Sequence, residues 1–159
     1  MKKKFSVSVN KKIEKFNKTI LVEGDKSISH RSLLIASQCI GISSINNILE
    51  SEDIKNTILC LKKLGVKILK KNKNYLVYGN GLGSFRKPKN NFLYAGNSGT
   101  LARMLFSILG TQSNLKVKIV GDSSLNKRDM KRIIDPLSKI GCNFFPKNKT
   151  TLPLTIEGT

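Results

Sequence analysis

The apolar residues of this chain recur at two spacings, one typical of helices and the other typical of strands. A spacing of three or four residues predicts helices, whereas alternation or short apolar runs between polar segments predict strands. The predicted helices cover residues 29–39, 54–64, 101–109 and 129–140. The predicted strands cover residues 5–9, 20–22, 42–48, 66–69, 75–78, 92–94, 115–119, 142–145 and 154–157.

The residues that flank these helices indicate where each should begin and end. Ser51 precedes Glu52 and Asp53, so a hydroxyl and two carboxylates should stabilise the start of the second helix. Pro136 should kink the fourth helix. Glycine is favoured just beyond a helix C-terminus, and we expect the four helices to end at Gly41, Gly65, Gly110 and Gly141.

The elements occur in two rounds with the same order. Gly24 and Arg31 of the first round recur as Gly96 and Arg103 of the second, about 72 residues later, which fits a whole βαβαββ unit. We therefore predict an α/β (α+β) fold in which two such units pack their helices together, with the sheets outside. The rounds cover residues 20–91 and 92–159, and residues 1–19 are predicted to be a strand and a connector.

Composition limits the function classes. The chain has 159 residues, of which 39% are hydrophobic and 25% charged, as in a globular domain. The net charge of +19 favours an anionic partner such as nucleic acid, a membrane surface or phosphorylated metabolites. However, the lysines are scattered, which is typical of a solvated surface. The absence of Trp and the 6% aromatic content disfavour base stacking.

The cysteines and the N-terminus bear on the cellular compartment. Cys39, Cys60 and Cys142 have no metal-ligand spacing and lie in apolar runs, so we expect buried free thiols in a reducing compartment. Neither a signal-peptide core nor an apolar run of membrane length is present in the sequence. We expect a cytoplasmic protein that binds neither membranes nor metal.

Residues 24–31, with the sequence GDKSISHR, are the strongest candidate for a binding site. A glycine turn that opens a helix leaves several backbone N–H groups unpaired and pointing at one spot. The ammonium of Lys26, the hydroxyls of Ser27 and Ser29 and the guanidinium of Arg31 should lie around that spot. This combination suits a phosphorylated small molecule.

Two further segments have related features. Residues 95–100, AGNSGT, form a second glycine turn before a helix, and residues 121–130, GDSSLNKRDM, contain Arg128. In the same order, the three segments resemble substrate loops of the EPSP synthase family, the 3-phosphoshikimate 1-carboxyvinyltransferases of the shikimate pathway. The resemblance runs from about residue 20 to residue 159. It implies a protein of two domains with three βαβαββ units each, of which this chain would hold two units and lack the third unit and the second domain.

The resemblance also implies a reaction and a set of site residues. Members join the 5-hydroxyl of shikimate 3-phosphate to the enol carbon of phosphoenolpyruvate and then release phosphate, without a cofactor. It assigns Lys26, Ser27 and Arg31 to shikimate 3-phosphate. It assigns Lys26, Gly99 and Arg128 to phosphoenolpyruvate, with Asn97 and Thr100 in support.

Two residues of these segments, Asp129 and His30, are not assigned to a substrate. Asp129 stands where the family usually has proline, and its carboxylate could either compete for Arg128 or cap the next helix. His30 is the only histidine, and the resemblance gives it no role in proton transfer, so we expect a structural role. The family's acid/base carboxylate and lysine lie in the second domain. The chain should therefore hold no catalytic residue and be inactive alone.

Other functions stay open at this point. The sister enolpyruvyl transferase that acts on a UDP-sugar shares the fold, but its first loop resembles Lys-Asn, whereas Ser27 and Arg31 favour shikimate 3-phosphate. A basic nucleic-acid-binding module would explain the charge but not the glycine turns. A folded chain without function is a third possibility. We expect a monomeric full-length enzyme, and self-association of this chain through uncovered sheet edges.

Overall fold

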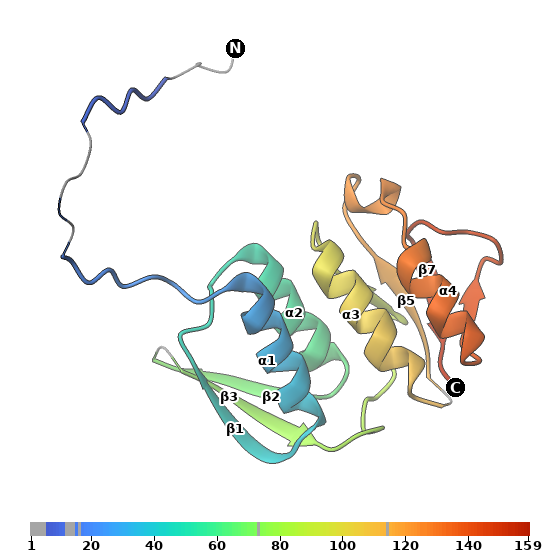
Figure 1. Cartoon of the computed structure of the whole chain (residues 1–159). Helices are drawn as coiled ribbons and strands as arrows, with labels where there is room; N and C mark the ends of the chain where they lie inside the picture. Colours follow the sequence, from blue (N-terminus) through green and yellow to red (C-terminus); the bar gives the residue numbers. More distant parts are fainter. Residues whose placement is uncertain (1–5, 12–14, 16, 73, 114) are drawn as a thin grey trace.

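The computed structural model describes residues 6–11, 15, 17–72, 74–113 and 115–159. Within these residues the chain forms helices and strands in two successive groups (Figure 1). The first group is α1 (Lys26–Gln38), β1 (Ile40–Asn46), α2 (Glu52–Lys63), β2 (Lys67–Lys71) and β3 (Asn74–Asn80). The second is β4 (Phe92–Tyr94), α3 (Gly99–Gly110), β5 (Lys116–Val120), the short 3-10 helix η1 (Leu125–Lys127), α4 (Lys131–Lys139), β6 (Asn143–Phe145) and β7 (Leu154–Glu157).

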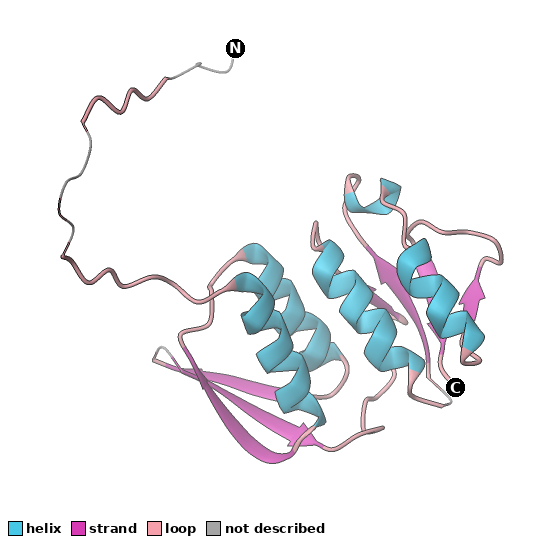
Figure 2. Cartoon of the chain, in the orientation of Figure 1, coloured by secondary structure: helices cyan, strands magenta, loops and turns pink. Residues whose placement is uncertain are grey.

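Each group builds its own sheet (Figure 2). In the first sheet the order is β1-β3-β2 and both pairings are antiparallel. In the second the order is β4-β5-β7-β6, with β4 parallel to β5 and the other pairings antiparallel. The order β1-β3-β2 therefore recurs as β5-β7-β6, which agrees with the predicted repeat and the predicted α/β class.

The helices lie between and alongside the two sheets and bury the core. Helices α1 and α2 pack together, α3 packs on α4 and β7, and α1 meets α3 where the two groups join (Figure 1). Leu33, Leu61 and Leu105 are fully buried on these helices. Phe106 of α3 packs edge-to-face on Phe144 of β6, with ring centroids 5.7 Å apart. Within the described part of the chain, no helix is long and apolar enough to cross a membrane.

The two N-terminal strand predictions are wrong for the described residues. Residues 6–9 form no strand, and Phe5 lies outside the described part. Residues 20–22 have no strand partner, although residues 92–94 at the equivalent place pair with β5. Leu21 is 95% exposed. An apolar run becomes a strand only when a sheet edge accepts its backbone hydrogen bonds, and the structure gives residues 20–22 no such edge. The first group is therefore αβαββ rather than βαβαββ.

Two further predictions near the end of α1 are also wrong. Gly41 does not end the helix, because α1 ends at Gln38 with Cys39 as its C-cap. Gly41 lies inside β1 with a φ of +99°, a backbone conformation that glycine adopts readily. Cys39 is exposed, whereas Cys60 and Cys142 are buried as expected. Burial raises the pKa of the Cys60 thiol to about 12, so this thiol stays protonated at neutral pH.

The starts of α1 and α2 differ in a way that can be measured. The Asp25 carboxylate accepts a hydrogen bond from the Ile28 N–H at 2.8 Å, whereas the Ser51 side chain makes no capping hydrogen bond. We expect Asp25→Ala to lower the free energy of unfolding by about 1 kcal/mol. Ser51→Ala should change it little, because the buried Ser51 hydroxyl has no partner among the described residues. Urea unfolding of both variants checks this, and equal losses would contradict it.

Candidate functional site

The first glycine turn is held in place by hydrogen bonds on both sides of Ser29. The Ser29 hydroxyl donates to the carbonyl of Asp25 at 2.7 Å and accepts from the N–H of Leu49 at 3.0 Å. Gly24 lies against the backbone of Asn47, where a Cβ atom would overlap a carbonyl oxygen. Ser29 is thus occupied within the turn rather than free for a ligand. Lys26 and Arg31 are exposed beside it.

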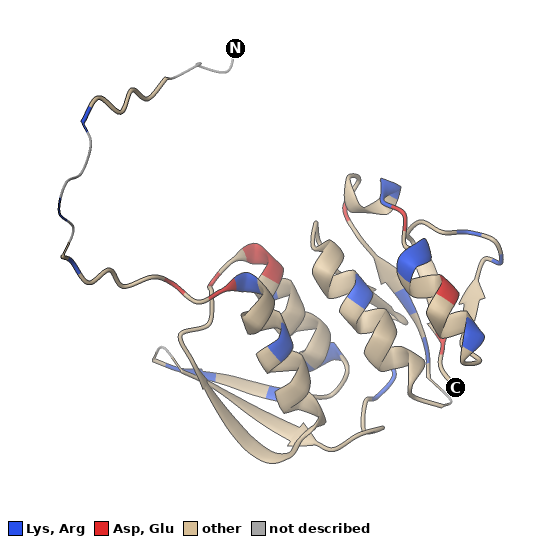
Figure 3. Cartoon of the chain, in the orientation of Figure 1, with Lys and Arg blue, Asp and Glu red and all other residues tan. Residues whose placement is uncertain are grey.

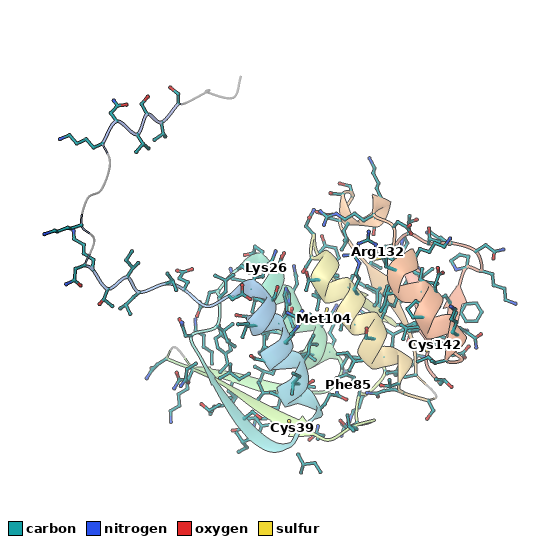
Figure 4. The ribbon with its side chains drawn as sticks, in the orientation of Figure 1. Lys26, Cys39, Phe85, Met104, Arg132 and Cys142 are labelled. Atoms are coloured by element: carbon teal, nitrogen blue, oxygen red, sulfur yellow. The ribbon has the colours of Figure 1, made fainter. Side chains whose placement is uncertain are left out.

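The Lys26 ammonium has a partner that the sequence did not indicate. Its Nζ lies 3.3 Å from Oδ2 of Asp53, at the start of α2, and about half of the Lys26 side chain is exposed. Figure 4 labels Lys26 at the beginning of α1. From the sequence, Asp53 was predicted only to stabilise the start of the second helix, because Lys26 and Asp53 are far apart along the chain. The ion pair therefore links the first turns of α1 and α2.

The second glycine turn opens α3 in a similar way. Ser98 is the N-cap of α3, and its hydroxyl oxygen accepts from the N–H of Leu101 at 3.2 Å. Gly96 has a φ of +60° and lies directly against the side-chain amide of Asn56 on α2. The turn is therefore packed on the first group of elements.

A chain of hydrogen bonds joins the third segment to the second turn. The Arg128 guanidinium donates to Oδ1 of Asn97 at 2.6 Å, and the Asn97 amide donates to Oδ2 of Asp122 at 2.6 Å. Asp122 in turn accepts from the N–H of Leu125 at 2.7 Å. Asn97 thus orients Arg128 directly. The sequence analysis did not predict this role of Asp122, although an Asp three residues before the first residue of η1 is a recognisable capping pattern.

Asp129 accepts a hydrogen bond at the start of the next helix instead of pairing with Arg128, although the N-cap residue of α4 is Met130. Its Oδ1 accepts from the N–H of Lys131 at 2.9 Å, at the start of α4. The ion pairs formed within the described residues do not include an Arg128–Asp129 pair. The Arg128 charge is therefore not neutralised by its neighbour.

Two guanidinium groups flank Gly99. A Cβ atom built there would lie 3.1 Å from Nη1 of Arg103 and 3.5 Å from Nη1 of Arg128. Arg103 donates to the Asp129 carbonyl at a long 3.4 Å, and its buried Nε has no hydrogen-bond partner within the described part of the chain. Two cations thus lie close to the bare backbone of Gly99 at the first turn of a helix, an arrangement that suits an anion.

The two turns come together through the helices. α1, α2 and α3 begin at the same end of the molecule (Figure 1), and Figure 3 shows basic residues on α1 and α3. Two contacts join the second turn to the first group of elements: Gly96 lies against Asn56 of α2, and the Ser98 hydroxyl lies 3.4 Å from the His30 imidazole of α1. The helix N-termini, which carry partial positive charge, therefore point to one region.

A separate groove of about 500 Å³ lies between α1 and α3. Its walls are mostly apolar, with Leu34, Ile35, Met104 and Ile108 on them, and Arg31 also lines it. Figure 4 labels Met104 there. Phosphorylated ligands need cations and N–H groups rather than apolar walls, so we place the candidate site at the helix N-termini and not in this groove.

The Asp122 carboxylate gives a test of the hydrogen-bond chain. The Leu125 N–H and then the Asn97 amide hold the pKa of Asp122 below its ordinary value of 3.8. The stabilisation is therefore complete above that value and is lost as the pH falls through the lowered pKa. We expect the stability difference between the wild type and Asp122→Asn to shrink under acid conditions. Carbon NMR titration of the carboxyl group checks the pKa, and a value above 3.8 would contradict the network.

A mixed α/β fold whose glycine turns gather cations at helix N-termini is typical of proteins that bind small anionic molecules. Comparison with known proteins is more specific. The sequence pattern of the family described as EPSP synthase (3-phosphoshikimate 1-carboxyvinyltransferase) matches residues 10–159. The chain belongs to this family.

Individual relatives agree with this assignment. The 3-phosphoshikimate 1-carboxyvinyltransferase of Oenococcus oeni is 43% identical over 148 residues, which is 93% of this chain and 33% of the relative. That of Petrotoga mobilis is 45% identical over 148 residues, or 92% and 34%. The solved EPSP synthase of Acinetobacter baumannii aligns with a TM-score of 0.81 and 36% identity over 88% of this chain and 32% of its own. The chain thus spans about a third of the length of these relatives.

Proposed function

We propose that this chain supplies part of the substrate site of a 3-phosphoshikimate 1-carboxyvinyltransferase. The reaction transfers the carboxyvinyl group of phosphoenolpyruvate to the 5-hydroxyl of shikimate 3-phosphate and releases phosphate. The observation that carries the proposal is the meeting of two glycine turns through the His30–Ser98 contact, with Lys26 on the first and Gly99 on the second. Both substrates are anions, which such helix N-termini bind well.

We assign the roles by turn. Ser27 and Arg31 hold shikimate 3-phosphate, with Arg31 making a charge-assisted pair to a phosphate. Gly99 lets the backbone approach phosphoenolpyruvate, and Arg128, oriented by Asn97 at 2.6 Å, binds its charge. Lys26 lies between the substrates, and Thr100 adds a hydroxyl at the second turn. We assign these residues to binding and none to proton transfer, and we place the protein in the cytoplasm.

Titration followed by amide NMR tests the proposal on the 159-residue chain. Shikimate 3-phosphate should shift the amide signals of residues 24–31, whereas shikimate, which lacks the phosphate, should shift them far less. A UDP-sugar and a short RNA at physiological salt serve as the competing ligands. Stronger binding of either one, or no response to shikimate 3-phosphate, would reject the proposal.

Turnover is a separate readout. We expect no phosphate release when the chain is mixed with both substrates, because it supplies binding groups and no acid or base. Release above a substrate blank would show that the chain holds catalytic groups as well, and the role assignment would then be wrong.

Gly99→Ala gives a smaller, ligand-specific effect. The new methyl group would lie 3.1 Å from a guanidinium nitrogen of Arg103 and close to Arg128. These flexible ends can move, so folding should survive, but the space for phosphoenolpyruvate shrinks. We expect phosphoenolpyruvate to bind several-fold more weakly and shikimate 3-phosphate nearly as before. Calorimetric titration of both ligands checks this, and equal losses would contradict the assignment of Gly99.

A further inference from the structure

His30 lies at the junction of three helices. Its side chain is fully buried in α1. Nδ1 lies 2.7 Å from the hydroxyl oxygen of Thr57 on α2, and Nε2 lies 3.4 Å from the hydroxyl oxygen of Ser98 at the head of α3. A single imidazole therefore joins the first group of elements to the second.

The neighbouring hydrogen-bond partners favour one tautomer. The Thr57 hydroxyl oxygen lies 3.1 Å from the carbonyl of Asp53, which can take its one proton and leave the oxygen to accept from His30. In that arrangement Nδ1 carries the ring proton, and Nε2 accepts from the Ser98 hydroxyl. Ser98 in turn accepts from the N–H of Leu101 at 3.2 Å. The result is one directed chain from α3 through α1 to α2.

The ends of this chain lie beside the candidate binding groups. At the α2 end, Asp53 supplies the carbonyl that accepts from Thr57 and the carboxylate that holds Lys26 at 3.3 Å. At the other end, Ser98 immediately precedes Gly99. A shift of the imidazole would therefore move groups at both turns, although His30 itself is buried.

Charge also favours the neutral ring. Burial lowers the pKa of His30, opposed by the nearby Asp53 and assisted by the positive charges of Lys26 and Arg31. A second ring proton would place an N–H against Ser98, and the Ser98 proton would lose its acceptor in a buried place.

We propose that His30 is a positioning residue that couples the two glycine turns, because its Nδ1–H imidazole fixes Ser98 relative to Thr57 and so sets the spacing between Lys26 and Gly99. Only the identity of the ligands rests on the proposed function. A histidine that merely filled the core could be replaced by an apolar residue without moving the second turn.

The first experiment needs no ligand. Nitrogen NMR of the imidazole should show the proton on Nδ1 and a hydrogen-bonded lone pair on Nε2. In amide NMR spectra, His30→Leu should move the signals of Gly99, Thr100 and Leu101. The control is Ser37→Ala, which removes a buried hydroxyl bonded to the Leu34 carbonyl elsewhere on α1 and should leave those signals in place.

A second pair of variants keeps the test decisive if His30→Leu fails to fold. Thr57→Val removes the acceptor but keeps the ring, and it should disturb the tautomer and the same amide signals. Thr57→Ser restores the hydroxyl and should restore both. A proton on Nε2 in the wild type, or unchanged signals at the second turn in Thr57→Val, would overturn the proposal.

The affinities of variants for the two ligands then measure the coupling between the two turns. His30→Leu and Ser98→Ala should each weaken phosphoenolpyruvate binding about 10-fold, and the double variant should be no weaker than the singles, because both break one chain. Shikimate 3-phosphate should be affected less, and Ser37→Ala should leave both affinities unchanged. Additive losses in the double variant would overturn the coupling. If the wild type binds neither ligand, the proposed function fails, and the NMR results still decide the role of His30.

Discussion

Gly24→Ala is expected to lower the free energy of unfolding by about 3 kcal/mol, because the new methyl group has no room. It would overlap the carbonyl oxygen of Asn47 and lie 3.1 Å from the backbone nitrogen of Leu49. Backbone atoms cannot rotate away as a side chain can, so either the first turn or the segment that follows β1 must move. Since the turn carries Lys26 and Ser27, binding of shikimate 3-phosphate should weaken too. Urea unfolding and calorimetric titration measure the two effects.

Gly83→Ala is the matched control. Gly83 has a φ of +74°, and a Cβ atom there meets nothing within 4 Å. Its replacement should cost only the strain of a left-handed alanine, roughly 1–2 kcal/mol, and leave ligand binding unchanged. A loss for Gly24→Ala no larger than this would show that the close approach to Asn47 does not hold the turn.

The fold could be predicted best where local pattern decides it. The hairpin of β2 and β3 follows from two apolar runs across a short Lys/Asn turn, and Gly65, with a φ of +94°, lies just beyond α2 as expected. Residues 20–22 have an equally apolar pattern, yet they form no strand. A strand depends on an edge elsewhere in the molecule, and a local pattern carries no information about that edge.

Gly41 shows a different limit. Glycine there predicted a helix end, but Gly41 lies in a strand with a positive φ, because β1 starts at Ile40, directly after the Cys39 cap of α1. A glycine with positive φ serves a strand as well as a helix end. Pro136 does lie inside α4, where its ring removes one backbone donor, and the predicted kink stays a prediction.

In the candidate site, the sequence pointed to the cations Lys26 and Arg128 but not to the side chains that bind them. Lys26 and Arg128 stand in recognisable local motifs. Their partners are distant in the sequence: Asp53 lies on another helix, and Asn97, although it stands in the second motif, reaches Arg128 from 31 residues away. Ser29 was expected to face the ligand, whereas its hydroxyl is used within the turn. Which polar groups form hydrogen bonds within the protein depends on its three-dimensional contacts, and a sequence motif alone does not reveal these.

Arg31 and Arg128 belong to different turns. Replacing each of them should therefore weaken the binding of a different ligand. Arg31 is on α1 with the first turn, and Arg128 is hydrogen-bonded to Asn97 of the second. We expect Arg31→Gln to weaken shikimate 3-phosphate by roughly 10- to 100-fold, as for the loss of a charge-assisted pair, and phosphoenolpyruvate much less. Arg128→Gln should do the reverse. Calorimetric titration of each variant with each ligand gives the four values.

Arg132→Gln controls for the general loss of positive charge. Arg132 is exposed on α4, as labelled in Figure 4, outside the groups assigned to the ligands. Its replacement removes the same unit of charge from a chain of net charge +19, so any effect through the overall field should appear here as well. A uniform small loss in all three variants would mean that scattered charge attracts these anions. If instead Arg31→Gln weakens mainly shikimate 3-phosphate and Arg128→Gln mainly phosphoenolpyruvate, the two phosphates must bind at separate positions, one at each turn.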